Sequence, residues 1–351
     1  MSKKLLTFAF IFVFCCISAR AADPPPAWLS DAARLPTPSF EIRNIPAVIL
    51  HNEENISITS EGKITRTNRF AVRVLIREGR EEAIARAVYQ TDGEKVRDIK
   101  AWLIRSNGQI KDYGKKETFD VAAVSNDLYN EARIKLIDAT DDADAGDVFG
   151  FETVSEEKTI FSQFSFQFQE RLPVLKARCT LNLPEGWKVE SVTFNHPKVE
   201  PAVSGNSYTW ELSNLQPINY EPSSPRWSSI SPRLAISFFP TQATATQIRT
   251  FTNWNDVARW MGEVEDAQMN INDDIAGKTQ DLTVNAKTEL EKIQAIARYV
   301  QQIQYISIQV GTKTGGGYRP NLATEVFAKS YGDCKDKANL MRAMLSVLKI
   351  S

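Results

Sequence analysis

The order of hydrophobic and polar positions divides the chain into two stretches with different periods. From about residue 56 to residue 240, short runs rich in Val, Ile, Thr and Phe alternate apolar and polar positions and end at Pro, Gly or Asn residues. Such runs predict β-strands, and many short strands at close spacing are typical of two packed sheets. We therefore predict a β-sandwich-like domain over residues 56–240, interrupted by a helix at 81–89.

Beyond residue 240 the apolar residues recur every three to four positions, which is the period of an amphipathic helix. The predicted helices cover residues 254–269, 288–303, 324–329 and 334–348, and a short strand is predicted at 305–310. The predicted fold class is therefore α+β, with a helical domain over residues 250–351 after the β-rich one.

The first 21 residues have the pattern of a signal peptide. Two lysines precede an apolar run at 5–17, which is too short to span a bilayer, and Ala19-Arg20-Ala21 matches a cleavage site. We expect an exported protein, periplasmic or secreted, that has no membrane span once the signal peptide at 1–21 is removed. Residues 22–55 are predicted to form a spacer before the β-rich domain.

Charge and composition exclude several classes of partner. Lys and Arg total 42 against 43 Asp and Glu, so the formal net charge of −1 gives no case for a nucleic acid partner. The two histidines, His51 and His196, lie beside polar residues, where solvated side chains are expected. The acidic run at 138–147 has alanine at two ligand positions of a calcium loop. We predict no metal and no cofactor.

The stretch SYGDCKDKANLMRAML, residues 330–345, places a cysteine at the start of an amphipathic helix. Asp333 is a natural N-cap, and Asp336 three residues later is the acidic partner of a capping box. Cys334 would then be the first helical residue, behind Gly332, where unpaired backbone N–H groups favour a thiolate. Cys334 is therefore a candidate nucleophile, although free cysteine can also be a small buried apolar residue.

The other cysteines change this interpretation little. Cys15 and Cys16 lie in the predicted signal peptide, so Cys179 and Cys334 remain in the mature chain. One disulfide between them would be compatible with an oxidising compartment, but it would bury the candidate nucleophile. Cys179 lies in an alternating run that reads as a half-buried strand, so we predict two free thiols, with Cys179 structural.

The carboxyl-terminal stretch YRPNLATEVFAKSYGDCKDKANLMRAMLSVLKI resembles the nucleophile segment of bacterial transglutaminase-like domains, which are papain-like thiol enzymes. In that family a Gly-Asp-Cys-Lys-Asp-Lys run carries the active cysteine, and it falls here on Gly332 to Lys337. A preceding Tyr-x-Pro segment matches at Tyr318 and Pro320. The upstream region is similar to the β-rich domain of unknown function that precedes such domains in exported bacterial proteins.

The resemblance implies that Cys334 attacks a peptide or glutamine amide of a protein or peptide substrate and forms a thioester. Hydrolysis would make the enzyme thiol protease-like, and transfer to an amine would make it a transglutaminase. Gly332, Asp333 and Asp336 would support the helix cap and the thiolate, and Tyr318 would lie in the substrate cleft.

In the family a His and an Asp follow the cysteine, but no histidine follows Cys334 here. We therefore expect a fragment that holds only the first half of the papain-like domain and is inactive by itself. The alternative is a non-catalytic binding module with a vestigial cysteine domain and an envelope protein as its partner.

Overall fold

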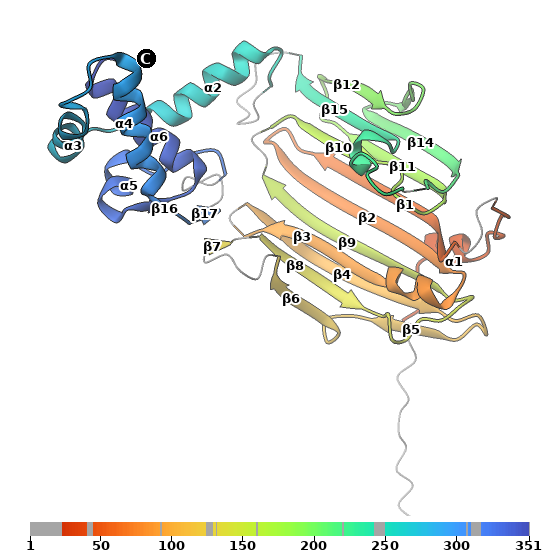
Figure 1. The fold of residues 1–351 in the computed structure, drawn as a ribbon. Helices are drawn as coiled ribbons and strands as arrows, with labels where there is room; N and C mark the ends of the chain where they lie inside the picture. Colours follow the sequence, from red (N-terminus) through yellow and green to blue (C-terminus); the bar gives the residue numbers. More distant parts are fainter. Residues whose placement is uncertain are drawn as a thin grey trace, which may run out of the picture.

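The computed structural model describes residues 23–40, 45–91, 93–123, 129–130, 132–158, 161–219, 221–241, 250–306, 308–309 and 317–350. The predicted signal peptide, with Cys15 and Cys16, lies outside these residues. Figure 1 shows a β-rich part and a helical part with α2 (Trp254–Asp266) between them, which confirms the α+β prediction.

One layer of the β-rich part is an eight-stranded sheet with β1 and β2 near its middle. Its strands are, in spatial order, β13 (Ala202–Ser204), β14 (Ser207–Leu215), β11 (Val174–Asn182), β1 (Ala47–Ile58), β2 (Lys63–Val74), β9 (Val148–Lys158), β4 (Glu94–Ile104) and β5 (Ile110–Tyr113). All neighbours pair antiparallel except β1 and β11, which pair parallel.

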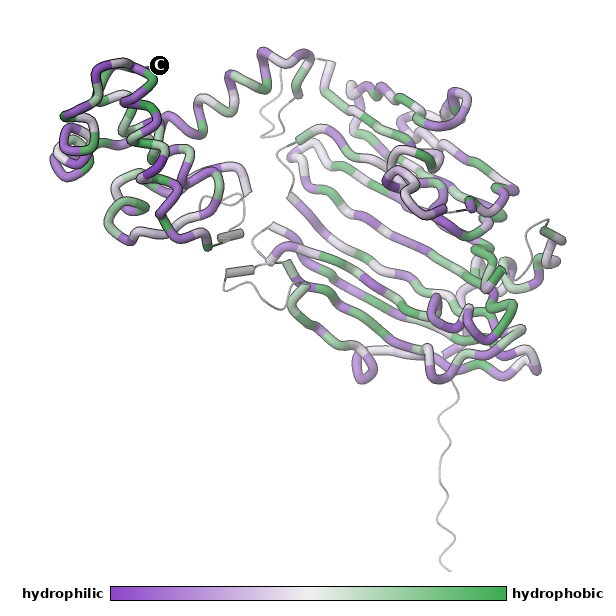
Figure 2. Tube along the Cα trace, viewed as in Figure 1, coloured by the Kyte–Doolittle hydropathy of each residue, from purple (hydrophilic) through white to green (hydrophobic). Residues whose placement is uncertain are grey.

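Two three-stranded sheets form the second layer of this part. They are β10 (Gln163–Gln167), β15 (Arg233–Pro240) and β12 (Trp187–Phe194), and β3 (Ile84–Gln90), β8 (Ala132–Asp138) and β6 (Thr118–Ala122). One hydrophobic core joins all three sheets, since Ile56 and Phe149 of the large sheet belong to the same buried cluster as Phe238 and Ile137 of the small ones. The strands alternate in hydropathy along their length (Figure 2), as a two-layer sandwich requires.

The helix α1 (Ala27–Ala33) packs on the opposite face of the large sheet. Leu29 is fully buried there with Val48 and Trp102. A β-carbon at Gly150 in β9 would lie 2.4 Å from Leu29 Cδ1, so the helix sits on the sheet only because glycine occupies that position. The close approach of α1 to β9 therefore depends on a single residue, Gly150.

The structure assigns regular elements to much of the predicted spacer at 22–55. It contributes α1 and most of β1, a strand inside the large sheet rather than a link before it. The polar run HNEEN at 51–55 interrupts the apolar–polar alternation from which a strand is predicted. In the folded protein its carboxylates are paired. Glu53 contacts the His51 ring, and Glu54 forms an ion pair with Arg66 of β2.

The predicted helix at 81–89 is wrong. The structure has a short 3₁₀ helix, η1 (Arg77–Glu82), followed by β3. Every residue of β3 pairs with β8, and the burial of Ala85 against the exposure of Val88 follows the alternation of a strand. Pairing with a distant strand thus overrides the local preference. A second 3₁₀ helix, η2 (Trp227–Ser229), precedes β15.

The helical part confirms the predicted helices and adds one. Its elements after α2 are α3 (Asp273–Thr283), α4 (Glu289–Gln302), β16 (Gln304–Tyr305), β17 (Ile308–Gln309), α5 (Ala323–Lys329), β18 (Tyr331–Gly332) and α6 (Cys334–Val347). Buried side chains from α3 to α6 share one core, including Ile296 and Met344. The hydrophobic periodicity does not reveal α3, because buried threonines occupy positions where apolar residues are expected. Thr279 and Thr283 each donate to the carbonyl four residues earlier, at 2.7 and 2.8 Å.

The two parts meet at two places in the described residues. β7 (Tyr129–Asn130), which lies between β6 and β8 in the sequence, pairs parallel with β17 of the helical part. The rings of Phe161, Trp260 and Tyr318 pack edge to face, with centroids 5.3 to 5.4 Å apart. None of the helices in the described residues has the length and apolar character of a membrane span.

Candidate active site

Cys334 is the first residue of α6, and its side chain is exposed. The preceding strand β18 pairs with β16, and the Ile306 N–H donates to the Gly332 carbonyl at 3.1 Å, so a short sheet fixes where the helix begins. The Asp333 carboxylate accepts from the N–H groups of Lys335 and Asp336 at 3.1 and 3.2 Å. The predicted N-cap is therefore present directly beside the thiol.

Asp336 completes the predicted capping box and is fully buried. Its Oδ2 accepts from the Asp333 N–H at 3.1 Å and from Asn321 Nδ2 at 3.1 Å, and its Oδ1 accepts from the Asn321 N–H at 2.7 Å. A β-carbon at Gly332 would lie 2.7 Å from the Asp336 β-carbon. Gly332 is thus required for the buried carboxylate to fit under the turn, and the carboxylate joins the cap to the segment around Asn321.

Tyr318 belongs to that segment, three residues before Asn321. Its side chain is 46% exposed, and its ring packs against Phe161 of the β-rich part and Trp260 of α2. The structure therefore brings Gly332, Asp333 and Asp336 together at Cys334. Tyr318 is connected to these residues through the backbone near Asn321, and the Tyr318 ring contacts the β-rich part.

Several supporting residues have no signal in the sequence pattern. Asn339 on α6 is buried, and its Nδ2 donates to the Gln268 carbonyl at 2.9 Å. The Gln268 carboxamide oxygen, oriented toward Arg319, accepts from the Nε and Nη2 of Arg319 at 2.9 and 2.6 Å. These contacts connect the end of α2 to α6 over a separation of 71 residues, which no local motif reveals.

The two lysines that flank Asp336 have different partners. Lys335 forms an ion pair with the Asp333 carboxylate next to the thiol. Lys337 Nζ donates to the carbonyls of Ile303 and Gln301 at 2.8 and 3.2 Å, at the carboxyl end of α4. A cation there satisfies carbonyls that lack helical donors, so Lys337 holds α4 and α6 together.

The backbone N–H groups at the start of α6 are partly used. The sequence predicts unpaired donors here, but those of Lys335 and Asp336 already bond to Asp333. Within the part of the chain that the structure describes, no acceptor is bonded to the N–H of Cys334 itself. This one donor, beside the thiol sulfur, is the helix-end group that remains for an oxyanion.

The second cysteine has a different environment. Cys179 in β11 is fully buried, and burial, followed by the charge of Glu54, raises the pKa of its thiol. Both cysteines are free, so the prediction of two free thiols with a structural Cys179 is confirmed.

Both histidines contact residues of the β-rich part. His51 Nε2 lies 3.0 Å from Glu53, and its ring packs on Trp28 with centroids 5.5 Å apart. With only 12% of its side chain exposed, His51 is not the solvated residue that the sequence predicts. His196 Nδ1 lies 2.9 Å from the Pro197 carbonyl. Among the described residues, neither ring contacts α6, so no imidazole lies beside Cys334 there.

The acidic run at 138–147 serves the fold. Asp147 is buried and accepts from the Ser106 N–H at 2.9 Å, and Asp142 bonds to Lys111 and Tyr113. No group of three or more His, Cys, Asp or Glu side chains in the described ranges is arranged to hold a metal ion.

Two family profiles match the chain. DUF3857, described as a domain of unknown function with a solved structure, matches residues 60–219, and the transglutaminase-like superfamily matches residues 276–351, which include the Cys334 helix. The chain joins a DUF3857 domain to a transglutaminase-like domain. None of the curated protein sequences matches it.

A solved structure shares this fold. A "putative protease" from Parabacteroides distasonis has 16% identity and a TM-score of 0.66, over 86% of this chain and 59% of its own. The chain therefore spans about three fifths of that protein. Yeast LTA4 hydrolase (10% identity, 61% of this chain and 33% of its own) and an M1 zinc metallopeptidase from Deinococcus radiodurans (9%, 63% and 53%) have TM-scores of 0.30 and 0.27.

Proposed function

We propose that Cys334 is the nucleophile of a thiol enzyme that acts on peptide or glutamine side-chain amides. Its sulfur forms a bond to the carbonyl carbon, the C–N bond breaks, and the amine leaves with a proton, so that a thioester remains. Water or a second amine then resolves the thioester. The observation that supports this role is the exposed thiol on a helix end held by the buried Asp336 in a transglutaminase-like domain.

Amide chemistry also needs a group that protonates the leaving amine. General acid–base help is typically worth about 100- to 10,000-fold, and within the described residues neither His51 nor His196 contacts α6. We therefore propose that residues 1–351 react at Cys334 with an activated ester, whose leaving group needs no proton, and give no measurable turnover of amides.

The test is acylation by p-nitrophenyl acetate, followed by intact-mass analysis. One acetyl group should be added to the chain and to a Cys179→Ala control, and none to Cys334→Ser. A glutamine-containing peptide should show no Cys334-dependent turnover. Equal acylation of the Cys334→Ser variant would contradict the nucleophile assignment and favour the alternative, a non-catalytic binding module.

We also propose, from the sequence alone, that the protein is exported after cleavage behind Ala21. The amino terminus of protein isolated from the source cells should be Ala22 or Asp23. Material that retains Met1 in the cytosol would contradict this proposal.

A further inference from the structure

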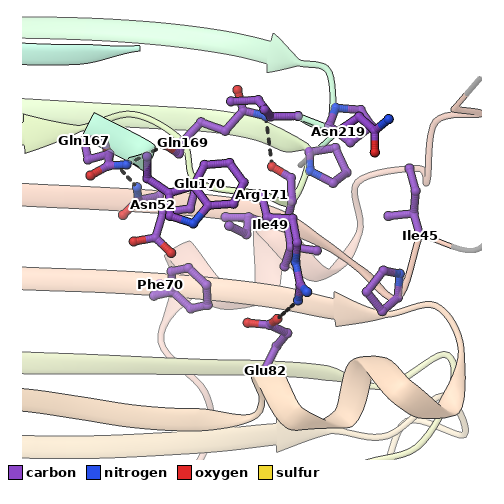
Figure 3. A pocket seen from close by; sticks show the side chains of 16 residues that line it. Ile45, Ile49, Asn52, Phe70, Glu82, Gln167, Gln169, Glu170, Arg171 and Asn219 are labelled. Carbon is purple, nitrogen blue, oxygen red and sulfur yellow. Dashed lines mark hydrogen bonds and ion pairs between the residues drawn. The ribbon is translucent and has the colours of Figure 1, made fainter. Parts of the chain in front are cut away.

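A pocket of about 880 Å³ opens between the two layers of the β-rich part (Figure 3). Its floor is formed by Ile49 and Asn52 of β1 and Phe70 of β2. The end of β10 at Gln167 and the following loop at 168–173 form one wall, and Glu82 at the end of η1 faces it. The volume lies within the range of natural ligand sites, and the lining residues belong to the β-rich part rather than to the nucleophile helix.

The strand β10 leads into this pocket and is the outer strand of its sheet. Within the described residues, β10 pairs with β15, and no second strand is paired along its other edge at residues 163–167. The Phe168 N–H donates to the Pro232 carbonyl at 3.1 Å, and the Ser162 carbonyl accepts from the Phe238 N–H at 2.9 Å. Because backbone groups alternate in an antiparallel ladder, those of the odd-numbered residues 163, 165 and 167 face away from β15.

Contacts at Gln167 confirm this direction. Its backbone carbonyl accepts from Asn52 Nδ2 on the pocket floor, at a long 3.4 Å, so the free edge of β10 faces the large sheet and the pocket (Figure 3). An edge strand with free N–H and C=O groups can pair with an extended chain.

The side-chain amides of the pocket wall are held with their oxygens unused. Gln167 Nε2 donates to the Gln169 carbonyl and Ser231 Oγ at 3.1 and 2.8 Å. Gln169 Nε2 donates to the carbonyls of Leu172 and Gln216 at 3.0 and 2.5 Å. In the described residues no donor is bonded to Oε1 of either glutamine. Two fixed acceptors beside an apolar floor suit the N–H groups of a peptide.

Carboxylates outnumber guanidinium groups along the same opening. Glu170 is exposed at the rim, and Glu82 forms an ion pair with Arg171 across the pocket at 3.2 Å. Next to β10, Arg66 lies 5.5 Å from the Phe164 ring centroid and is paired with two acids. Those two acids are Glu54 and Glu157. Within the pocket lining, the two acids Glu82 and Glu170 against the one arginine Arg171 favour a ligand with positive charge.

We propose that the β-rich domain binds an extended peptide segment with basic side chains, which adds as a strand to the free edge of β10 and ends in the Phe70 pocket. The strand edge distinguishes this ligand from an oligosaccharide, which has no use for a row of alternating backbone groups. The site does not depend on the chemistry at Cys334, so the two proposals can fail separately.

Fluorescence anisotropy with the whole chain carrying Cys334→Ser tests the proposal, because this variant cannot process the probe. The probe is a fluorescein-labelled heptapeptide of alternating Val and Lys. The same peptide with Glu in place of Lys, or with N-methyl groups on alternate residues, should bind at least about tenfold more weakly, as expected for lost charge complementarity or lost main-chain hydrogen bonds.

Matched variants locate the site. Ser165→Pro removes an N–H on the free edge without touching the bonds to β15 and should weaken binding about tenfold, whereas Ser165→Ala should leave it within about twofold. Glu170→Gln should weaken binding about threefold, and Glu200→Gln, an exposed acid outside the pocket lining, should not.

Three results would overturn the proposal. They are equal affinity for the N-methylated and unmodified peptides, unchanged affinity in a folded Ser165→Pro variant, and saturable binding of an N-acetylglucosamine tetramer in place of the peptide. If circular dichroism shows that Ser165→Pro is unfolded, the comparison of the two peptides decides by itself.

Discussion

The two free cysteines lie in regions that treat the same side chain in opposite ways. Cys179 is in the interior of β11, between Glu54 of β1 and Trp210 of β14, and is fully buried. Cys334 is at the first position of α6 and is exposed. A strand inside a sheet has its backbone groups paired on both sides, so the thiol there only fills space in the core.

A helix end provides what the sheet interior lacks. The first N–H groups of a helix have no helical acceptor, and in α6 Asp333 takes two of them. The N–H of Cys334 remains, beside an accessible sulfur. We therefore expect the reactivity of each thiol to follow from the free donors and the exposure of its position, both of which the fold supplies.

The largest difference is expected in alkylation. With iodoacetamide at pH 7, Cys334 should react at least about a thousandfold faster than Cys179, since Cys179 reacts only when its sheet opens and burial raises the pKa of its thiol. Mass spectrometry of the labelled peptides measures both rates. Cys334→Ser should abolish the fast phase and Cys179→Ala should preserve it. Comparable slow rates at both sites would contradict the comparison.

The buried cap beneath Cys334 should be the next most sensitive feature. Asp336→Ala removes a carboxylate that accepts from Asn321 and Asp333, and should lower the unfolding free energy of the helical part by about 2–4 kcal/mol. Glu291 fills the same position in the exposed capping box of α4, so Glu291→Ala should cost only about 0.5–1 kcal/mol. Urea denaturation followed by tryptophan fluorescence tests this pair. Equal losses would mean that burial of Asp336 adds nothing to the cap.

The same contrast explains what could be predicted from the sequence. The start of α6 was predictable because Asp333, Cys334 and Asp336 are neighbours in the chain and a capping box is a local pattern. The partner that buries Asp336 was not, since Asn321 lies 15 residues earlier in an irregular segment.

In the β-rich part the local signal gives strands but not their neighbours. The parallel pairing of β1 with β11 joins residues more than 100 positions apart, and the polar run at 51–55 hides β1 because its charges find partners only after the sheet forms. The proposed site on β10 could not be predicted for the same reason, because an edge is defined only once its sheet exists.

Replacing either sulfur by oxygen should affect stability differently in the two regions. Cys179→Ser places a hydroxyl in the core with Trp210 and should destabilise the β-rich part by about 1–3 kcal/mol. Cys334→Ser leaves its hydroxyl in water and should change stability by less than about 0.5 kcal/mol. Differential scanning calorimetry measures both. A loss at Cys334 as large as that at Cys179 would show that the exposed thiol is part of the packing.

The smallest effect should appear in the acid titration of the sheet that holds Cys179. The hydrogen bond with His51 lowers the pKa of Glu53 from its ordinary value of 4.5, burial opposes this, and the charges of His51 and Arg69 reinforce it. A carboxyl whose pKa is lower in the folded state stabilises above its unfolded pKa, and that contribution is lost as the pH falls through the folded pKa. Glu53→Gln should therefore lower stability more at pH 7 than at pH 3, because the contribution of the carboxylate is lost as the pH falls through its folded pKa. The exposed Glu190→Gln variant is the control, and urea midpoints at the two pH values measure the difference. An equal loss at both pH values would assign the role of Glu53 to its shape rather than to its charge.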